Sequence, residues 1–109
     1  MEWTLSVSEL NEYVSRSLRM DPMLRSLRLS GEISGFKRAV SGHWYFSLKD
    51  DRSRIDCVMF ASDAMKTAFF PKDGLRVVLT GTVNLYTAAG RYQFYAQRME
   101  QDGLGALYL

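Results

Sequence analysis

The sequence predicts a small, mainly β domain: a closed barrel of five strands, with one helix before the first strand and a second helix between strands three and four. Five segments alternate apolar and polar residues with a period of two, which is typical of half-buried strands. Glycines stand midway in two of these segments, where they let a strand bend sharply. The chain has 109 residues, 47% of them hydrophobic and 24% charged, as expected of one folded domain.

The N-terminal helix is predicted from its cap. Ser6 and Glu9 fit a capping box, in which each side chain accepts a free backbone N–H at the start of the helix. Apolar residues then recur at spacings of three and four and form one apolar face: Val7, Leu10, Val14 and Leu18. Asp21 and Pro22 end this helix and favour one further short turn through Leu24.

The first two strands are predicted on either side of a polar loop. Leu27 to Ser34 alternate around Gly31, and residues 35–42 follow as the loop. The second strand covers residues 43–49. Its alternation directs three side chains inward, Trp44, Phe46 and Leu48, and three outward, Tyr45, Ser47 and Lys49. We therefore expect Trp44 in the core.

The third strand is predicted over Arg54 to Phe60, after a turn that contains two adjacent acids, Asp50 and Asp51. Such a pair is more typical of a turn than of a metal site. The inward face of this strand stays open between two sets: Ile55, Cys57 and Met59, or Val58 and Phe60. The second helix is expected over residues 62–70, with Ser62 as its cap.

Two long strands, over residues 75–86 and 91–100, complete the predicted barrel, and residues 87–90 form the hairpin loop between them. One side of the first strand carries Val77, Leu79, Gly81, Val83 and Leu85, and one side of the second carries Tyr92, Phe94 and Ala96. This order of helices and strands is that of the Greek-key barrel known as the OB-fold.

We divide the chain into a helical extension, 1–25, the barrel, 26–102, and a segment, 103–109, that begins a linker to a further domain. That last segment contains three leucines and a tyrosine, which either fold back onto the barrel or lead into the missing domain. The sequence has neither a signal peptide pattern nor an apolar run of about 18 residues. We therefore expect a cytoplasmic protein.

We expect no catalytic residue, metal or cofactor in this chain. Cys57 and His43 are the single cysteine and the single histidine, which are too few for a metal site built from these residues. Cys57 stands midway along an apolar strand, where a cysteine usually packs in the core rather than acting as a nucleophile. A glycine-rich phosphate-binding motif is absent.

Cations lie in two stretches without acids, 36–49 and 74–99, although the net charge is only +2. These stretches contain the two loops that flank the groove of an OB-fold barrel. We expect them to form a basic face. The candidate phosphate contacts are Lys37, Arg38, Lys49, Arg54 and Arg91. His43 is a further candidate, which could instead cap a strand.

Aromatic residues stand beside these cations, and nucleic-acid bases stack on such rings. The candidates for base stacking are Phe36, Tyr45 and Tyr86. Phe36 and Tyr86 could instead plug an end of the barrel. Tyr92 is expected in the core, because it shares a strand face with Phe94.

The motifs LSGEISGFK, residues 29–37, and SGHWYFSLKD, residues 41–50, resemble the N-terminal domain of the exodeoxyribonuclease VII large subunit. Three shorter segments match as well: SVSELN at 6–11, CVMF at 57–60 and GLGAL at 103–107. The family often has asparagine where this chain has Gly35. The resemblance extends over nearly the whole chain.

The resemblance implies an OB-fold that binds single-stranded DNA and presents it to a nuclease domain that this chain lacks. The parent enzyme would degrade single-stranded DNA to oligonucleotides from both ends, and a small subunit would join it through the missing region. Two alternatives remain. The barrel could dock the catalytic domain or a neighbouring subunit, or it could bind RNA, as similar anticodon-binding domains do.

Overall fold

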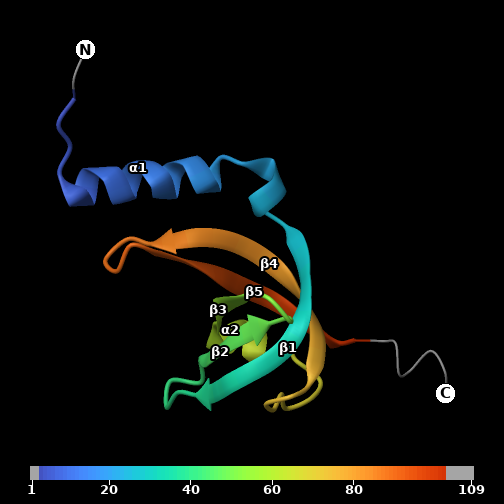
Figure 1. Ribbon diagram of the computed structural model, residues 1–109. Coiled ribbons are helices and arrows are strands. Elements are labelled where there is room, and N and C mark those ends of the chain that lie inside the picture. The colour runs from blue at the N-terminus through green and yellow to red at the C-terminus, as the bar shows by residue number, and fades with distance from the viewer. Residues whose placement is uncertain (1–2, 103–109) are drawn as a thin grey trace.

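The computed structural model describes residues 3–102 and shows a closed barrel with the strand order β1-β2-β3-β5-β4 (Figure 1). The strands are β1 (Leu27–Arg38), β2 (Trp44–Lys49), β3 (Arg54–Met59), β4 (Arg76–Tyr86) and β5 (Arg91–Gln101). All neighbouring strands pair antiparallel except β3 and β5, which pair parallel. The predicted fold class is confirmed.

Helix α1 (Val7–Arg19) lies along β4, and the short helix η1 (Pro22–Leu24) connects it to β1 (Figure 1). The predicted capping box is present, since the Glu9 N–H donates to Ser6 Oγ at 3.0 Å and the Ser6 N–H donates to Glu9 Oε1 at 2.8 Å. The apolar face predicted for the helix is covered only in its second half. Val7 remains 76% exposed and Leu10 49% exposed.

The capping box predicts that α1 contributes less stability in acid. Hydrogen bonds from the Ser6 backbone N–H and then from the Ser6 hydroxyl hold the pKa of Glu9 below its ordinary value of 4.5. A lowered folded pKa adds stability above the unfolded pKa, and this stability is lost as the pH falls through the folded value. In urea unfolding, Glu9→Gln should therefore be less stable than the wild type at pH 7, and this difference should shrink as the pH is lowered to 3. An unchanged difference between the two proteins at both pH values would contradict this.

The core consists of the residues whose side chains the alternation directs inward, and it confirms the faces predicted for β2 and β4. Its fully buried members include Ile33, Met59, Val77, Leu79 and Phe94. The open question about β3 is settled in favour of Ile55, Cys57 and Met59, which pack in or against the core. Val58 is also buried, but its register partner is the outward-facing Tyr45, so it lies on the outer face of the sheet.

The loop predicted over residues 35–42 is wrong in its first half, because β1 continues to Arg38. The cause is a β-bulge. Ser34 pairs with Ser47 and Lys37 pairs with Tyr45, so β1 has one extra residue there. Gly35 adopts a φ of +65°, which glycine reaches without steric cost. The true connection to β2 spans only residues 39–43.

The second helix is much shorter than predicted. Helix α2 spans Ala61–Ala64, and its N-cap is Phe60, so Ser62 lies within the helix rather than at its cap. No side chain of the N-cap residue bonds to the helix. The cap comes from a distant segment instead, since the Ala61 N–H donates to Nδ1 of His43 at 2.9 Å. A contact of this kind leaves no pattern in the local sequence.

Close packing at Gly81 explains the sharp bend of β4 against β5. A Cβ atom built at Gly81 would lie 2.1 Å from the carbonyl oxygen of Tyr95, where no real side chain fits. The β4–β5 register shifts between Thr80 and Gly81, which adds a bulge at the same point. The mid-strand glycine thus lets the two backbones approach closely beside a bulge.

Among the helices of residues 3–102, none is both long and apolar enough to cross a membrane. The predicted linker, 103–109, lies outside the described residues.

Candidate nucleic-acid interface

Cross-strand pairing places five residues in one row on the outer face of the barrel. The register pairs Lys37 with Tyr45, Tyr45 with Val58, Val58 with Tyr95, and Tyr95 with Thr82. Paired residues of neighbouring strands direct their side chains to the same face of the sheet. The row therefore runs across all five strands and includes two of the predicted site residues, Lys37 and Tyr45.

Aromatic rings gather around this row. We call His43, Tyr45, Phe60 and Tyr95 the aromatic band. The rings of Phe60 and Tyr95 are stacked, with centroids 6.0 Å apart. His43 meets Phe60 edge-on at 5.3 Å and Tyr45 edge-on at 6.5 Å. Tyr45 is 43% exposed and Phe60 46% exposed, so the band offers flat apolar surface to solvent.

His43 has a structural role within the band. Its Nδ1 accepts the Ala61 N–H that begins α2, while its ring touches the rings on either side. The histidine thus fixes the start of α2 and the neighbouring Phe60. This agrees with the capping alternative, although the capped element is a helix rather than a strand.

Phe36 turns into the barrel rather than towards the band. Its ring lies 5.4 Å from that of Trp44 and 6.2 Å from that of Phe46, and it packs against the core. The bulge at Gly35 causes this orientation, because the extra residue shifts the inward position to Phe36 and the outward position to Lys37. Phe36 therefore plugs one end of the barrel, which is the alternative weighed for it above.

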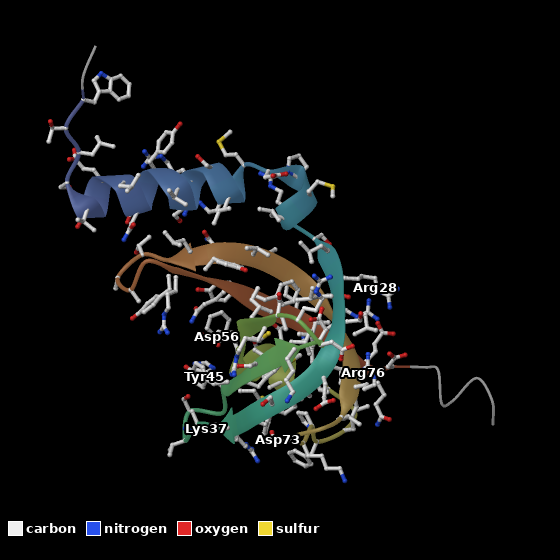
Figure 2. The ribbon with its side chains drawn as sticks, in the orientation of Figure 1. Arg28, Lys37, Tyr45, Asp56, Asp73 and Arg76 are labelled. Atoms are coloured by element: carbon white, nitrogen blue, oxygen red, sulfur yellow. The ribbon has the colours of Figure 1, made fainter. Side chains whose placement is uncertain are left out.

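Of the two cations that end β1, only Lys37 lies in the row, because the register partner of Arg38 is the inward-facing Trp44. Lys37 is exposed beside Tyr45, and Figure 2 shows both on the same side of the barrel as Asp56. Arg38 is exposed as well, and its guanidinium lies 5.8 Å from the centroid of the Phe70 ring. Arg28 and Arg76 lie on the opposite side of the molecule (Figure 2).

The remaining predicted cations cluster near the β4–β5 hairpin. Arg54 and Arg91 line the same hollow with Asp56, and Arg54 donates to Ser47 Oγ at 2.7 Å. Lys49 lies 3.8 Å from the Glu32 carboxylate, an exposed ion pair that neutralises part of its charge. Arg54 and Arg91 are thus the stronger candidates at this end.

Asp56 corrects the expectation of a face without acids. It stands on β3, between the two acid-free stretches, and Ser47 donates a hydrogen bond to it at 3.2 Å. The stretches 36–49 and 74–99 lack acids, but β3 lies between β2 and β5 in the barrel. The Asp56 carboxylate of β3 therefore lies between the strands that these stretches form. The outer surface beside the aromatic band therefore contains one carboxylate, with cations towards both ends.

The hairpin arm of β4 and β5 carries two exposed tyrosines. Tyr86 is 48% exposed. Burial, and to a smaller extent Tyr86, raise the pKa of the Tyr95 phenol. Tyr92 is 57% exposed, so its predicted place in the core is wrong. Tyr92 and the buried Phe94 lie on the same face of β5, but Tyr92 is in the hairpin arm, beyond the end of the barrel core.

The described residues offer no catalytic constellation. Burial raises the pKa of the Cys57 thiol to about 12, and the side chain packs in the core as predicted. Asp50 forms the predicted turn, since its Oδ1 accepts the N–H groups of Arg52 and Ser53, which lower its pKa. Within residues 3–102 no three His, Cys, Asp or Glu side chains lie together as metal ligands.

Sequence reasoning missed three residues of this surface: Phe60, Tyr95 and Asp56. Phe60 was counted as a possible core residue of β3, and Tyr95 alternates with buried neighbours on β5. Alternation with the inward-facing Phe94 could have predicted that Tyr95 faces outward. The sequence could not have predicted that Tyr95 joins the aromatic band, because this depends on the parallel pairing of β3 with β5.

Comparisons with known proteins agree with this architecture. Residues 5–100 match the family described as OB-fold nucleic acid binding domain. The chain is 53% identical over 104 residues to the exodeoxyribonuclease 7 large subunit of Lactobacillus delbrueckii subsp. bulgaricus, with 95% of this chain and 23% of the relative covered. It is 47% identical over 105 residues to that of Alkaliphilus metalliredigens, with 96% and 26% covered. The chain thus spans about a quarter of the length of these relatives.

Solved structures share the fold. A replication protein A heterotrimer bound to ssDNA superposes with a TM-score of 0.60 at 15% identity, covering 78% of this chain and 65% of the other. The asparaginyl-tRNA synthetase of Pyrococcus horikoshii gives a TM-score of 0.56 at 16% identity, with 74% and 21% covered.

Proposed function

Because this chain belongs to the family of OB-fold nucleic acid binding domains, we propose that the aromatic band and its flanking cations bind single-stranded DNA. The observation that carries the proposal is the continuous row from Lys37 to Tyr95, in which the exposed ring of Tyr45 stands beside Lys37. Solvent-exposed aromatic rings can stack on unpaired bases. Duplex DNA does not offer such bases, because they are already paired and stacked.

The charge distribution suggests how the strand lies. Lys37 at one end, and Arg54 and Arg91 at the other, would hold phosphates. Asp56 between them would repel phosphates from the surface beside the aromatic band, so the bases rather than the backbone would face Tyr45. Stacking on rings distinguishes little between bases, and sequence preference should therefore be slight.

In the parent protein, this domain would present the strand to a nuclease domain. The chain is similar to the exodeoxyribonuclease 7 large subunits over 95% of its own length, yet spans only 23% of theirs. We therefore place the phosphodiester hydrolysis, and any contact with a small subunit, in the part of the parent protein outside this chain. The expected location is the cytoplasm.

Fluorescence anisotropy with labelled oligo-dT, oligo-U and a DNA duplex tests the proposal. We expect oligo-dT to bind, the duplex to bind more weakly, and the logarithm of the affinity for oligo-dT to fall by about 0.7 per phosphate contact for each log unit of salt. A preference for oligo-U would favour the RNA-binding alternative. Binding to none of the three at low salt would overturn the proposal and favour a docking role.

A further inference from the structure

A second basic cleft lies outside the aromatic band, between α1, η1 and β4. Its lining includes Arg16, Arg19 and Arg25 from the helical extension and Thr82 and Asn84 from β4, around an open volume of about 510 Å³. The residues that line it, all within the described part of the chain, include no acid.

Hydrogen bonds hold two of these arginines in place. The Arg19 guanidinium donates to Ser15 Oγ at 3.0 Å, and the buried Ser15 donates in turn to Asn84 Oδ1 at 3.1 Å. Arg25 Nε donates to the Arg19 carbonyl at 3.1 Å. A guanidinium has five N–H donors, so each retains donors for a ligand. Within residues 3–102, none of the three forms an ion pair with a carboxylate.

The acids of α1 do not compensate this charge. Glu9 is engaged in the capping box, and Asp21 accepts the Met23 N–H. Glu12 lines a second hollow, which Arg16 also reaches, but within residues 3–102 the two form no ion pair. The carbonyl end of α1 balances the charge in part, as helix C-termini do. The helix is therefore acidic in its first half and basic in its second.

The cleft continues the row of the aromatic band. Thr82 lines the cleft and is the register partner of Tyr95, so both side chains lie on one face of the β4–β5 ribbon. From Tyr45 to Thr82 the row crosses three strand spacings, a distance of about 14 Å. A strand bound on the band can thus reach the cleft around the outside of β5 and β4.

We propose that this cleft binds backbone phosphates of the same single strand and so extends the binding site from β2 and β3 to α1. The inference rests on the proposed function. Guanidinium groups suit the ligand, because they bind phosphodiester oxygens in a bidentate geometry. The helical extension would then be part of the nucleic-acid interface rather than only a cover for β4.

The test compares oligo-dT of roughly 5 and roughly 15 nucleotides, near the two ends of the site sizes known for OB-folds. Arg16→Gln combined with Arg25→Gln should weaken binding of the longer probe about 25-fold at 0.1 M salt and lower the salt slope by about 1.4, which corresponds to two lost phosphate contacts. Binding of the shorter probe should stay unchanged. Arg16→Gln alone, which removes no hydrogen bond of the fold, should weaken binding of the longer probe about 5-fold.

The control is Arg28→Gln combined with Arg76→Gln, which removes the same charge from two exposed ion pairs on the side of the barrel opposite Lys37 and Tyr45 (Figure 2). It should affect the two probe lengths equally. If the cleft variants also affect both lengths equally, or neither, the cleft is no part of the site while the band still is. If the wild type binds neither probe, the proposed function fails as well.

Discussion

Replacing Gly81 with alanine is expected to lower the free energy of unfolding by about 4 kcal/mol or more, an exceptional effect for one methyl group. The added Cβ would lie 2.1 Å from the Tyr95 carbonyl oxygen and 2.9 Å from the Tyr95 carbonyl carbon. Both atoms belong to the backbone of β5. The clash can therefore be relieved only by separating β4 from β5, which carry Leu79 and Phe94 of the core.

Urea unfolding followed by tryptophan fluorescence measures this effect. Gly90→Asn serves as the control, because Gly90 has a φ of +66° and its Cβ would meet no atom closer than 3.5 Å. Asparagine tolerates this left-handed conformation, so the control should cost about 1 kcal/mol or less. A Gly81→Ala protein as stable as this control would show that the two strands do not pack as closely as described.

Replacing Tyr45 with alanine should weaken oligo-dT binding by about 5- to 150-fold, which corresponds to about 1–3 kcal/mol for one stacked base. Tyr45 lies at the centre of the row, and its exposed ring stands beside Lys37. Its partner Val58 is buried and offers no substitute surface. Anisotropy titrations at one fixed salt concentration measure the loss.

Two variants separate stacking from other effects of the substitution. Tyr45→Phe keeps the ring and loses the hydroxyl, so it should bind almost as well as the wild type. Tyr13→Ala makes the same change as Tyr45→Ala at an exposed tyrosine of α1 and should leave affinity unchanged. If Tyr45→Ala binds as well as Tyr13→Ala while remaining folded, Tyr45 is no part of the site.

Much of the fold follows from short-range patterns that a sequence displays directly. The capping box of Ser6 and Glu9 and the alternation of Trp44, Phe46 and Leu48 rest on contacts between near neighbours in the chain. Where a contact between residues distant in the chain determines the structure, as at helix α2, the prediction from the sequence fails. Helix α2 ends early and is capped by His43, which lies 18 residues earlier in the chain.

The candidate site could be predicted only in part for the same reason. Tyr45 follows from the alternation of the second strand and Lys37 from the acid-free stretch 36–49, and the structure places the two together. Phe60 and Asp56 depend on which face β3 turns outward, which its mixed apolar pattern left open. The misplacement of Tyr92 has another cause: alternation tells which face a residue occupies but not where along a strand the core ends.

The single extra residue of β1 determines which faces the residues after it occupy. Deleting Gly35 alone would remove the bulge and leave Phe36 inward and Lys37 outward, whereas deleting Ser34 and Gly35 together would turn Phe36 out to water and Lys37 into the apolar interior. The two-residue deletion should therefore be poorly tolerated, and changes in length should be much better tolerated at Val40 and Ser41, whose side chains are exposed. A library of length variants selected for folded protein would show this contrast within a span of eight residues, 34–41.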